Sequence, residues 1–220
     1  MISSPTWFRS NGSFPSHAAD PHCRKVHMIR FIPLLLLFAI LAPAQDVTAR
    51  AQTGDFKMTR VLFFKRKPKF HIPVQYSITY GAPAWRSAFD DQLAAAKGKN
   101  VRLRFGKDFW TTLDTNTDLT IGGAKIKAGP YYLVLEHTKG NSINIVALNA
   151  NDIRDKKLDA FQSGSTTGGI VIPCKHKKSD KETDSLQIKL IAGKEPTTGT
   201  LGVRFGPHSL AAAIKVHYGN

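Results

Sequence analysis

The chain has 220 residues, which is enough for one or two domains. Hydrophobic residues make up 42% of it and charged residues 21%, a composition typical of globular proteins and not of a wholly disordered chain. The formal net charge is +15, which favours contact with anionic partners such as acidic polysaccharide, lipid head groups or nucleic acid.

Residues 31–42 form an apolar run of twelve residues that follows Arg30. The run is too short to span a bilayer, but a basic residue followed by an apolar stretch of this length is typical of a signal peptide. Small-residue cleavage patterns follow at 42–44 and at 49–51. The sequence therefore predicts a signal peptide and cleavage region over 28–51. The mature protein is expected to be periplasmic or extracellular, with no transmembrane anchor.

Signal peptides begin close to the translation start, whereas 27 residues precede Met28 here. We therefore expect Met28 to be the true initiator and residues 1–27 to be upstream sequence. The four cations and one acid of residues 1–44 contribute +3, so a charge of +12 belongs to the rest of the chain. Cys23 precedes the signal peptide, which leaves Cys174 as a single thiol, expected to be buried and without a disulfide partner.

A basic lead-in over residues 52–70 carries six Lys or Arg residues around the apolar group Val61–Phe64. The apolar group is consistent with a first strand, whereas the charges are typical of a solvated linker. A single β-rich domain is expected to follow over 71–220.

Apolar residues occupy every second position from Ile72 to Tyr80, and this alternation is the strongest folding signal in the sequence. Successive side chains of a strand point to opposite faces, so the segment is predicted to be a strand with one apolar face. The same pattern predicts further strands over 101–105, 186–190, 201–205 and 210–216.

Tyr131–Glu136 is apolar on both faces until its end, which predicts a central strand covered on both sides. Residues 139–141 are typical of a tight turn, which would join this strand in a hairpin to 143–146. A shorter strand is expected around Ile126.

One helix is predicted to begin after a cap at Asn151 or Asp152 and to end at Gly164. Residues 92–96 are consistent with another short helical turn. Many short strands separated by turn signals indicate an all-β fold, an antiparallel β-sandwich or barrel-like domain with one short helix.

Four motifs follow one another: Y-G-x-P at 80–83, K-D-F-W at 107–110, I-G-G at 121–123 and A-G-x-Y at 128–131. In this order they resemble the secreted bacterial family catalogued as domain of unknown function 2911. The likeness covers roughly residues 72–148 and continues more loosely to the C-terminus. It implies an exported, β-rich domain whose activity is not established.

The commoner form of that family has arginine after the tryptophan and then a Gly-Ala-Asn run. Here Trp110 is followed by Thr111-Thr112-Leu113-Asp114 instead. A family site that used this arginine is altered in this chain, so the resemblance assigns no catalytic residue.

Tyr80, Trp85, Arg86 and Trp110 are the candidate ligand-binding residues. Aromatic rings offer flat apolar faces to sugar rings, and arginine offers a fork of donors to carboxylate or phosphate. The loop 81–84 would hold Trp85 and Arg86 just beyond a strand end, where loops commonly carry function. Alternatively both tryptophans belong to the core, where truncation to alanine costs about 3–5 kcal/mol.

Asp114, Asp118 and Glu136 are weaker candidates, as the acid and base of a hydrolase. Such a pair of carboxylates works only when the two groups lie about 5–10 Å apart. Glu136 and His137 are neighbours on a strand and point to opposite faces, so they cannot form one acid–base pair. We expect His137 to be a hydrogen-bonded histidine at the strand end.

Cys174 and His176 share one face of an extended segment and could supply two metal ligands. Two more ligands would be needed, and no second cluster offers them at a recognisable spacing. No metal or cofactor is therefore predicted.

Three functional interpretations remain open. The first is a non-enzymatic envelope domain that binds an anionic or carbohydrate partner, such as an envelope polymer or polysaccharide. Predicted export argues against nucleic acid as that partner. The second is a β-sandwich hydrolase that uses the carboxylates. The third is a structural or oligomerising subunit that pairs through an exposed sheet edge.

Overall fold

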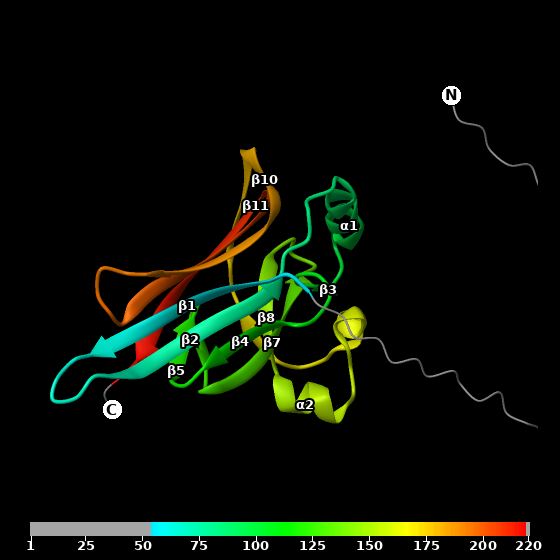
Figure 1. The fold of residues 1–220 in the computed structure, drawn as a ribbon. Helices are drawn as coiled ribbons and strands as arrows, with labels where there is room; N and C mark the ends of the chain where they lie inside the picture. Colours follow the sequence, from blue (N-terminus) through cyan, green and yellow to red (C-terminus); the bar gives the residue numbers. More distant parts are fainter. Residues whose placement is uncertain (1–53, 219–220) are drawn as a thin grey trace, which may run out of the picture. The chain divides into compact units, whose positions relative to one another are not determined.

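The computed structural model of the protein describes residues 54–218. The upstream segment 1–27, the signal peptide and cleavage region 28–51, and Cys23 lie outside the described residues. Within the described part, the chain forms two antiparallel β-sheets with a few short helices at one end (Figure 1). The prediction of an all-β, sandwich-like domain is confirmed. None of the helices in residues 54–218 is long and apolar enough to cross a bilayer.

The larger sheet has seven strands. Its path runs through β1, β2, β4, β7, β8 and β9, and β3 pairs with β7 beyond the end of β4. The bounds are β1 Phe56–Lys65, β2 His71–Gly81, β3 Val101–Arg104, β4 Thr111–Thr115, β7 Gly129–His137, β8 Ile143–Asn149 and β9 Ile170–Ile172.

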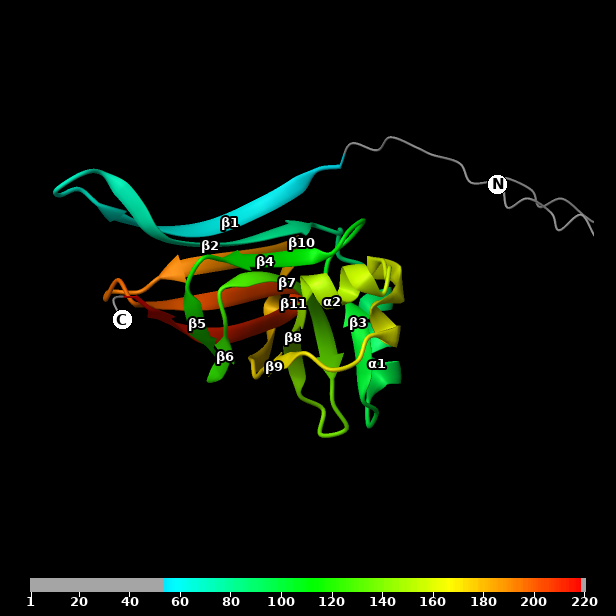
Figure 2. The same ribbon diagram turned by 90° about the horizontal axis from the view of Figure 1, so that it is seen from below.

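The smaller sheet has four strands in the order β10-β11-β5-β6. Two of them, β10 and β11, form a long hairpin that dominates the sheet (Figure 2). The bounds are β5 Asp118–Ile121, β6 Ala124–Ile126, β10 Lys175–Ala192 and β11 Thr198–His217.

The basic lead-in is part of the larger sheet. Strand β1 pairs with β2 in antiparallel register, with Phe63 opposite Val74. The strand interpretation of Val61–Phe64 is therefore confirmed, and the folded sheet begins before residue 71.

Strand β11 joins two segments that the sequence predicts as separate strands, 201–205 and 210–216. The chain continues through Gly206, whose φ of +55° belongs to the left-handed region that glycine enters without strain. The ladder with β10 shifts register opposite this point, near Thr183. A bulge therefore joins the two predicted segments into one strand.

The prediction of a single helix over residues 151–164 is wrong, because two short helices occupy this segment. Helix α2 covers Ala150–Asp155 and is capped by the side chain of Asn149, and the 3₁₀-helix η1 covers Ala160–Ser165. Between them the chain turns through Lys157 at a φ of +53°, and Asp159 starts η1 with a capping box. The predicted helical turn at 92–96 belongs to α1, Ala88–Ala96.

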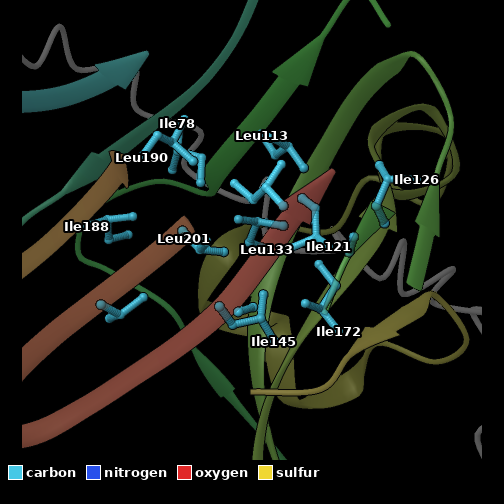
Figure 3. Packing of buried hydrophobic residues seen from close by; sticks show 14 of the residues in the cluster. Ile78, Leu113, Ile121, Ile126, Leu133, Ile145, Ile172, Ile188, Leu190 and Leu201 are labelled. Carbon is cyan, nitrogen blue, oxygen red and sulfur yellow. The ribbon is translucent and has the colours of Figure 1, made fainter. Parts of the chain in front are cut away.

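The main core lies between the two sheets (Figure 3). The alternating apolar residues of β2 from Val74 to Tyr80 are buried, and side chains of both sheets interdigitate around them, whereas Ile72 at the start of the strand is exposed beyond the core. The residues labelled in the figure are each less than one-tenth exposed: Ile78, Leu113, Ile121, Ile126, Leu133, Ile145, Ile172, Ile188, Leu190 and Leu201.

A smaller cluster covers the outer face of the larger sheet. Val134 on β7 packs with Val146 and Leu148 on β8 and with Ile153 of α2. Strand β7 is thus covered on both faces, which confirms the prediction made for Tyr131–Glu136.

Candidate functional site

A pocket of about 240 Å³ lies between the two sheets where α1 crosses their end. Leu103 of β3 and Leu135 of β7 form one wall, and Leu186 of β10 and Val203 of β11 form the other. The side of α1 closes the space with residues such as Phe89 and Leu93. The lining is predominantly apolar and comes from five strands, the loop after β2 and a helix.

Trp85 enters this pocket because the loop after β2 is bound to β10. The Trp85 amide donates a hydrogen bond to the Asp184 carbonyl at 2.7 Å, and the Leu186 amide donates to the Pro83 carbonyl at 3.0 Å. A β-carbon at Gly206 would overlap the Trp85 indole. The bulge in β11 therefore allows the indole to lie directly on the backbone.

Three aromatic rings pack together at this point. Phe205 meets the Trp85 ring edge-on, with centroids 4.9 Å apart, and meets Phe89 at 4.8 Å. Trp85 and Phe89 are 5.8 Å apart. Such tilted and edge-on pairs stabilise beyond the area that they bury, so the rings form a firm wall of the pocket.

A chain of polar side chains, which we call the clasp, joins α1 to β10 and β11 beside the pocket. Nε2 of His208 lies 2.6 Å from Oδ1 of Asp90, and Nδ1 of His208 lies 2.9 Å from Nε2 of His176. The ammonium group of Lys178 lies 3.5 Å from Oδ2 of Asp90. The clasp therefore consists of Asp90, His208, His176 and Lys178, and it holds the helix against the smaller sheet.

Two members of the clasp have shifted pKa values. The hydrogen bond from His208, together with the charges of His208 and Lys178, lowers the pKa of Asp90. Desolvation of its ring, and then the nearby His208, His137 and Lys178, lowers the pKa of His176 below its ordinary value of 6.5. His176 is accordingly neutral at pH 7.

The clasp uses both ring nitrogens of His208. Nε2 of His208 is bonded to Asp90 and Nδ1 to Nε2 of His176. Both ring nitrogens of His208 are therefore engaged within the clasp. The clasp is therefore a structural tether, and a ligand in the pocket meets mainly carbon.

The structure separates the four predicted ligand-binding residues. Trp85 lines the pocket, and Arg86 is exposed next to it in the loop. Tyr80 is only 4% exposed and belongs to the core, where its hydroxyl bonds to the backbone of Ile188. Trp110 lies in the outer cluster, where it stacks on Tyr132 with centroids 5.1 Å apart.

The three candidate carboxylates do not come together. Asp114 is exposed on β4 opposite Pro130 of β7, and Glu136 lies six residues further along β7, about 20 Å away at the usual rise of a strand. Glu136 forms an ion pair with Arg102 at 3.2 Å. Asp118 lies in the other sheet and pairs with Lys127 at 2.7 Å.

His137 differs from the expectation. It is buried at the end of β7 as predicted, but its Nδ1 has no hydrogen-bond partner within residues 54–218. Cys174 is partly buried, and burial raises the pKa of its thiol to about 11. Cys174 and His176 gain no further ligands, because the described part of the chain holds no group of three His, Cys, Asp or Glu side chains that suits a metal ion.

Sequence reasoning missed Phe89, Phe205 and His208 as residues of the site. Phe205 was assigned only to a strand face, and Phe89 lay outside every predicted element. The Gly206-Pro207 pair inside an alternating run was the available signal, since glycine in a strand often marks a bulge where another group approaches closely.

Comparisons of the chain with protein-family models, with curated proteins and with solved structures find no match. The resemblance to domain of unknown function 2911 therefore stays a prediction. The pocket beneath α1, with Trp85 as the predicted residue that it contains, is the candidate functional site.

Proposed function

We propose that this protein is a binding domain that holds a small, mainly apolar molecule in the pocket beneath α1. The observation that carries the proposal is the pocket itself, an apolar space between two sheets at the point where the core is left unfilled. The pocket of about 240 Å³ opens from the surface between the sheets, and its predominantly apolar walls are those that an apolar ligand would cover.

The volume limits the ligand. Dry apolar cavities of about 150 Å³ already hold a benzene-sized molecule, whereas pockets for drug-sized ligands run from about 300 Å³ upward. A space of about 240 Å³ suits a substituted aromatic ring or a short acyl chain.

The lining also selects against sugars. A sugar ring carries hydroxyl groups that would lose their hydrogen bonds to water, at a cost of about 1–3 kcal/mol for each group left unpaired. Among the polar side chains that line the pocket, His208 already bonds within the clasp, whereas Nη1 of Arg104 is buried and has no hydrogen-bond partner within residues 54–218. The pocket therefore favours a mainly apolar molecule, with at most one acceptor group to meet Arg104, over a carbohydrate with many hydroxyl groups, and the predicted export would put this binding outside the cytoplasm.

A fluorescence titration tests the proposal. The uncharged dye N-phenyl-1-naphthylamine is added to the purified full chain, and energy transfer from tryptophan to the dye is recorded. We expect saturable transfer that Trp85→Phe reduces strongly. Leu93→Phe, which adds volume at the helical wall, is expected to weaken binding by about tenfold because the new ring occupies the space.

Leu158→Phe is the matched control, since Leu158 is partly buried against the outer cluster and lies outside the pocket lining. It is expected to bind the dye like the parent. Equal affinity in the Leu93→Phe and parent proteins, with both folded by circular dichroism, would refute the proposed pocket.

A further inference from the structure

The hairpin of β1 and β2 carries a basic and aromatic tip at the end of the domain opposite α1. Figures 1 and 2 both show the turn between these strands projecting beyond the rest of the domain. Residues 64–70 form this tip, with the sequence Phe-Lys-Arg-Lys-Pro-Lys-Phe. All seven residues are exposed.

Two phenylalanine rings mark the apex. Phe64 is 61% exposed and Phe70 is 60% exposed. Their rings stack at a centroid distance of 6.2 Å and an angle of 24°. Single exposed apolar residues are ordinary on a protein surface. A stacked pair at a projecting turn forms a small apolar patch whose exposure to water is unfavourable.

Four cations surround the pair: Lys65, Arg66, Lys67 and Lys69. The stretch 56–81, which includes the whole hairpin, contains no Asp or Glu. Within residues 54–218, none of the four cations forms an ion pair. The tip thus presents uncompensated positive charge around an apolar centre.

We infer that the β1–β2 tip docks on an anionic lipid bilayer, with the Phe64 and Phe70 rings entering the headgroup region and the cations meeting lipid phosphates. Basic groups near an anionic membrane are attracted to it, and adjacent apolar side chains gain by leaving water at the acyl boundary. The long stems of lysine let each ammonium group stay in the interface while the rings go deeper.

The aromatic pair decides between a bilayer and a soluble polyanion. A charged polymer would form ion pairs with the four cations and would leave both rings in water. The two rings cover one face of each other and remain about 60% exposed, so they form a compact apolar patch at the apex. Only a partner with its own apolar layer uses both features, and this docking is independent of the pocket beneath α1.

Vesicle flotation of the purified full chain tests the charges. Vesicles contain phosphatidylcholine alone or phosphatidylcholine and phosphatidylglycerol in a two-to-one ratio. We expect binding to the anionic vesicles that falls about tenfold or more when Lys65, Lys67 and Lys69 are changed to Glu. The control changes Lys97, Lys99 and Lys139 to Glu, which alters net charge equally at the opposite end of the domain and should lower binding far less.

The aromatic contribution is tested in the same assay. Phe64→Ser with Phe70→Ser is expected to weaken binding to anionic vesicles by about tenfold, because the apolar contact is lost while every charge remains. The control is Phe161→Ser with Val171→Ser, which removes two exposed apolar side chains elsewhere. Residues 1–53 are identical in all variants, so differences between variants report on the substituted residues.

A local readout completes the test. In a Phe64→Trp variant, lipids brominated on their acyl chains should quench the new tryptophan, whereas a Phe161→Trp variant should show no such quenching. Docking on lipid is overturned if the serine pair binds like the parent, which indicates a charge-only contact with polyanions. It is equally overturned by absent quenching at position 64, or by equal binding to both kinds of vesicle.

Discussion

Two tyrosines on the same face of β2 have contrasting surroundings. The hydroxyl of Tyr80 accepts from the Ile188 amide at 3.0 Å and lies 3.3 Å from the Ile188 carbonyl, to which it donates, so it joins the two sheets. The hydroxyl of Tyr76 is buried and has no partner within the described residues. Burial without compensation also raises the pKa of Tyr76.

This contrast predicts opposite outcomes for the same substitution. Tyr80→Phe should lower the free energy of unfolding by about 1–3 kcal/mol, because the backbone of Ile188 loses its buried partner. Tyr76→Phe should change it by less than about 0.5 kcal/mol, or stabilise the fold, because it removes a group that had already lost its hydrogen bond to water. Urea unfolding followed by circular dichroism measures both.

If the two variants lose the same stability, the Tyr80 hydroxyl does not tie the sheets together. The comparison is well matched, since both residues occupy inward positions four residues apart on one strand.

Single residues were the hardest part of the site to predict from the sequence. Alternation placed Tyr80 on an inward face correctly, yet nothing in its pattern separated a core tyrosine from a binding one. Trp85 and Trp110 looked equivalent, but the first reaches the space between the sheets and the second lies outside the larger sheet. The face of a sheet that a loop residue reaches depends on hydrogen bonds between segments far apart in the sequence, such as those between the Trp85 loop and β10.

At the scale of elements, the clasp controls how firmly α1 is attached. Asp90 belongs to the helix, His208 to β11, and His176 and Lys178 to β10. The helix carries no other ion pair to the smaller sheet among the described residues. Protonation of the clasp should therefore loosen the helix and the pocket together.

The pH dependence of stability follows from the two lowered pKa values. As the pH falls below about 6.5, the unfolded chain protonates at His176 before the folded chain does, so stability decreases. The contribution of Asp90 is kept above its unfolded pKa and is lost only as the pH falls through its lower folded value. Two successive losses are expected, the first from the histidine.

Thermal melts between about pH 7 and pH 5 check the first loss. His176→Gln should flatten the decline, because the glutamine amide can still form a hydrogen bond with His208 but does not titrate. Lys175→Gln, a change at the neighbouring exposed residue outside the clasp, should leave the decline as in the parent. An unchanged slope in His176→Gln would show that other groups cause the decline.

Elements with strong alternation were predicted well, and those without it were not. Strands β2, β7 and β8 bury one or both faces, so their apolar pattern identifies them. Strand β4 is short and rich in threonine, and the first half of β10 is charged and exposed on both faces. Strand β4 is buried mainly through threonine, and the exposed part of β10 is held by pairing with β11, so a hydrophobic pattern does not reveal either segment.

At the scale of the whole molecule, the two sheets share one continuous core. Neither sheet covers its own inner face, because the apolar side chains of each pack against the other. The domain is therefore expected to unfold in a single cooperative step.

The two tryptophans of the described region report on this cooperativity. Trp85 lies at the pocket and Trp110 in the outer cluster, so a Trp85→Phe variant and a Trp110→Phe variant observe different layers. In each variant the urea transition by tryptophan fluorescence should coincide with that by circular dichroism. An earlier fluorescence transition in the protein that keeps Trp85 would mean that α1 opens separately.

The Y-G-x-P and K-D-F-W motifs meet where Gly81 approaches Lys107 closely. The Gly81 carbonyl accepts a hydrogen bond from the Lys107 amide at 3.1 Å, and a side chain at Gly81 would strike the Lys107 carbonyl. Trp110 in turn stacks on Tyr132. These contacts stabilise the scaffold, while Phe205 and the clasp lie outside both motifs. Proteins that share the two motifs would therefore share the framework, while the residues that line the pocket, and hence the ligand, could differ.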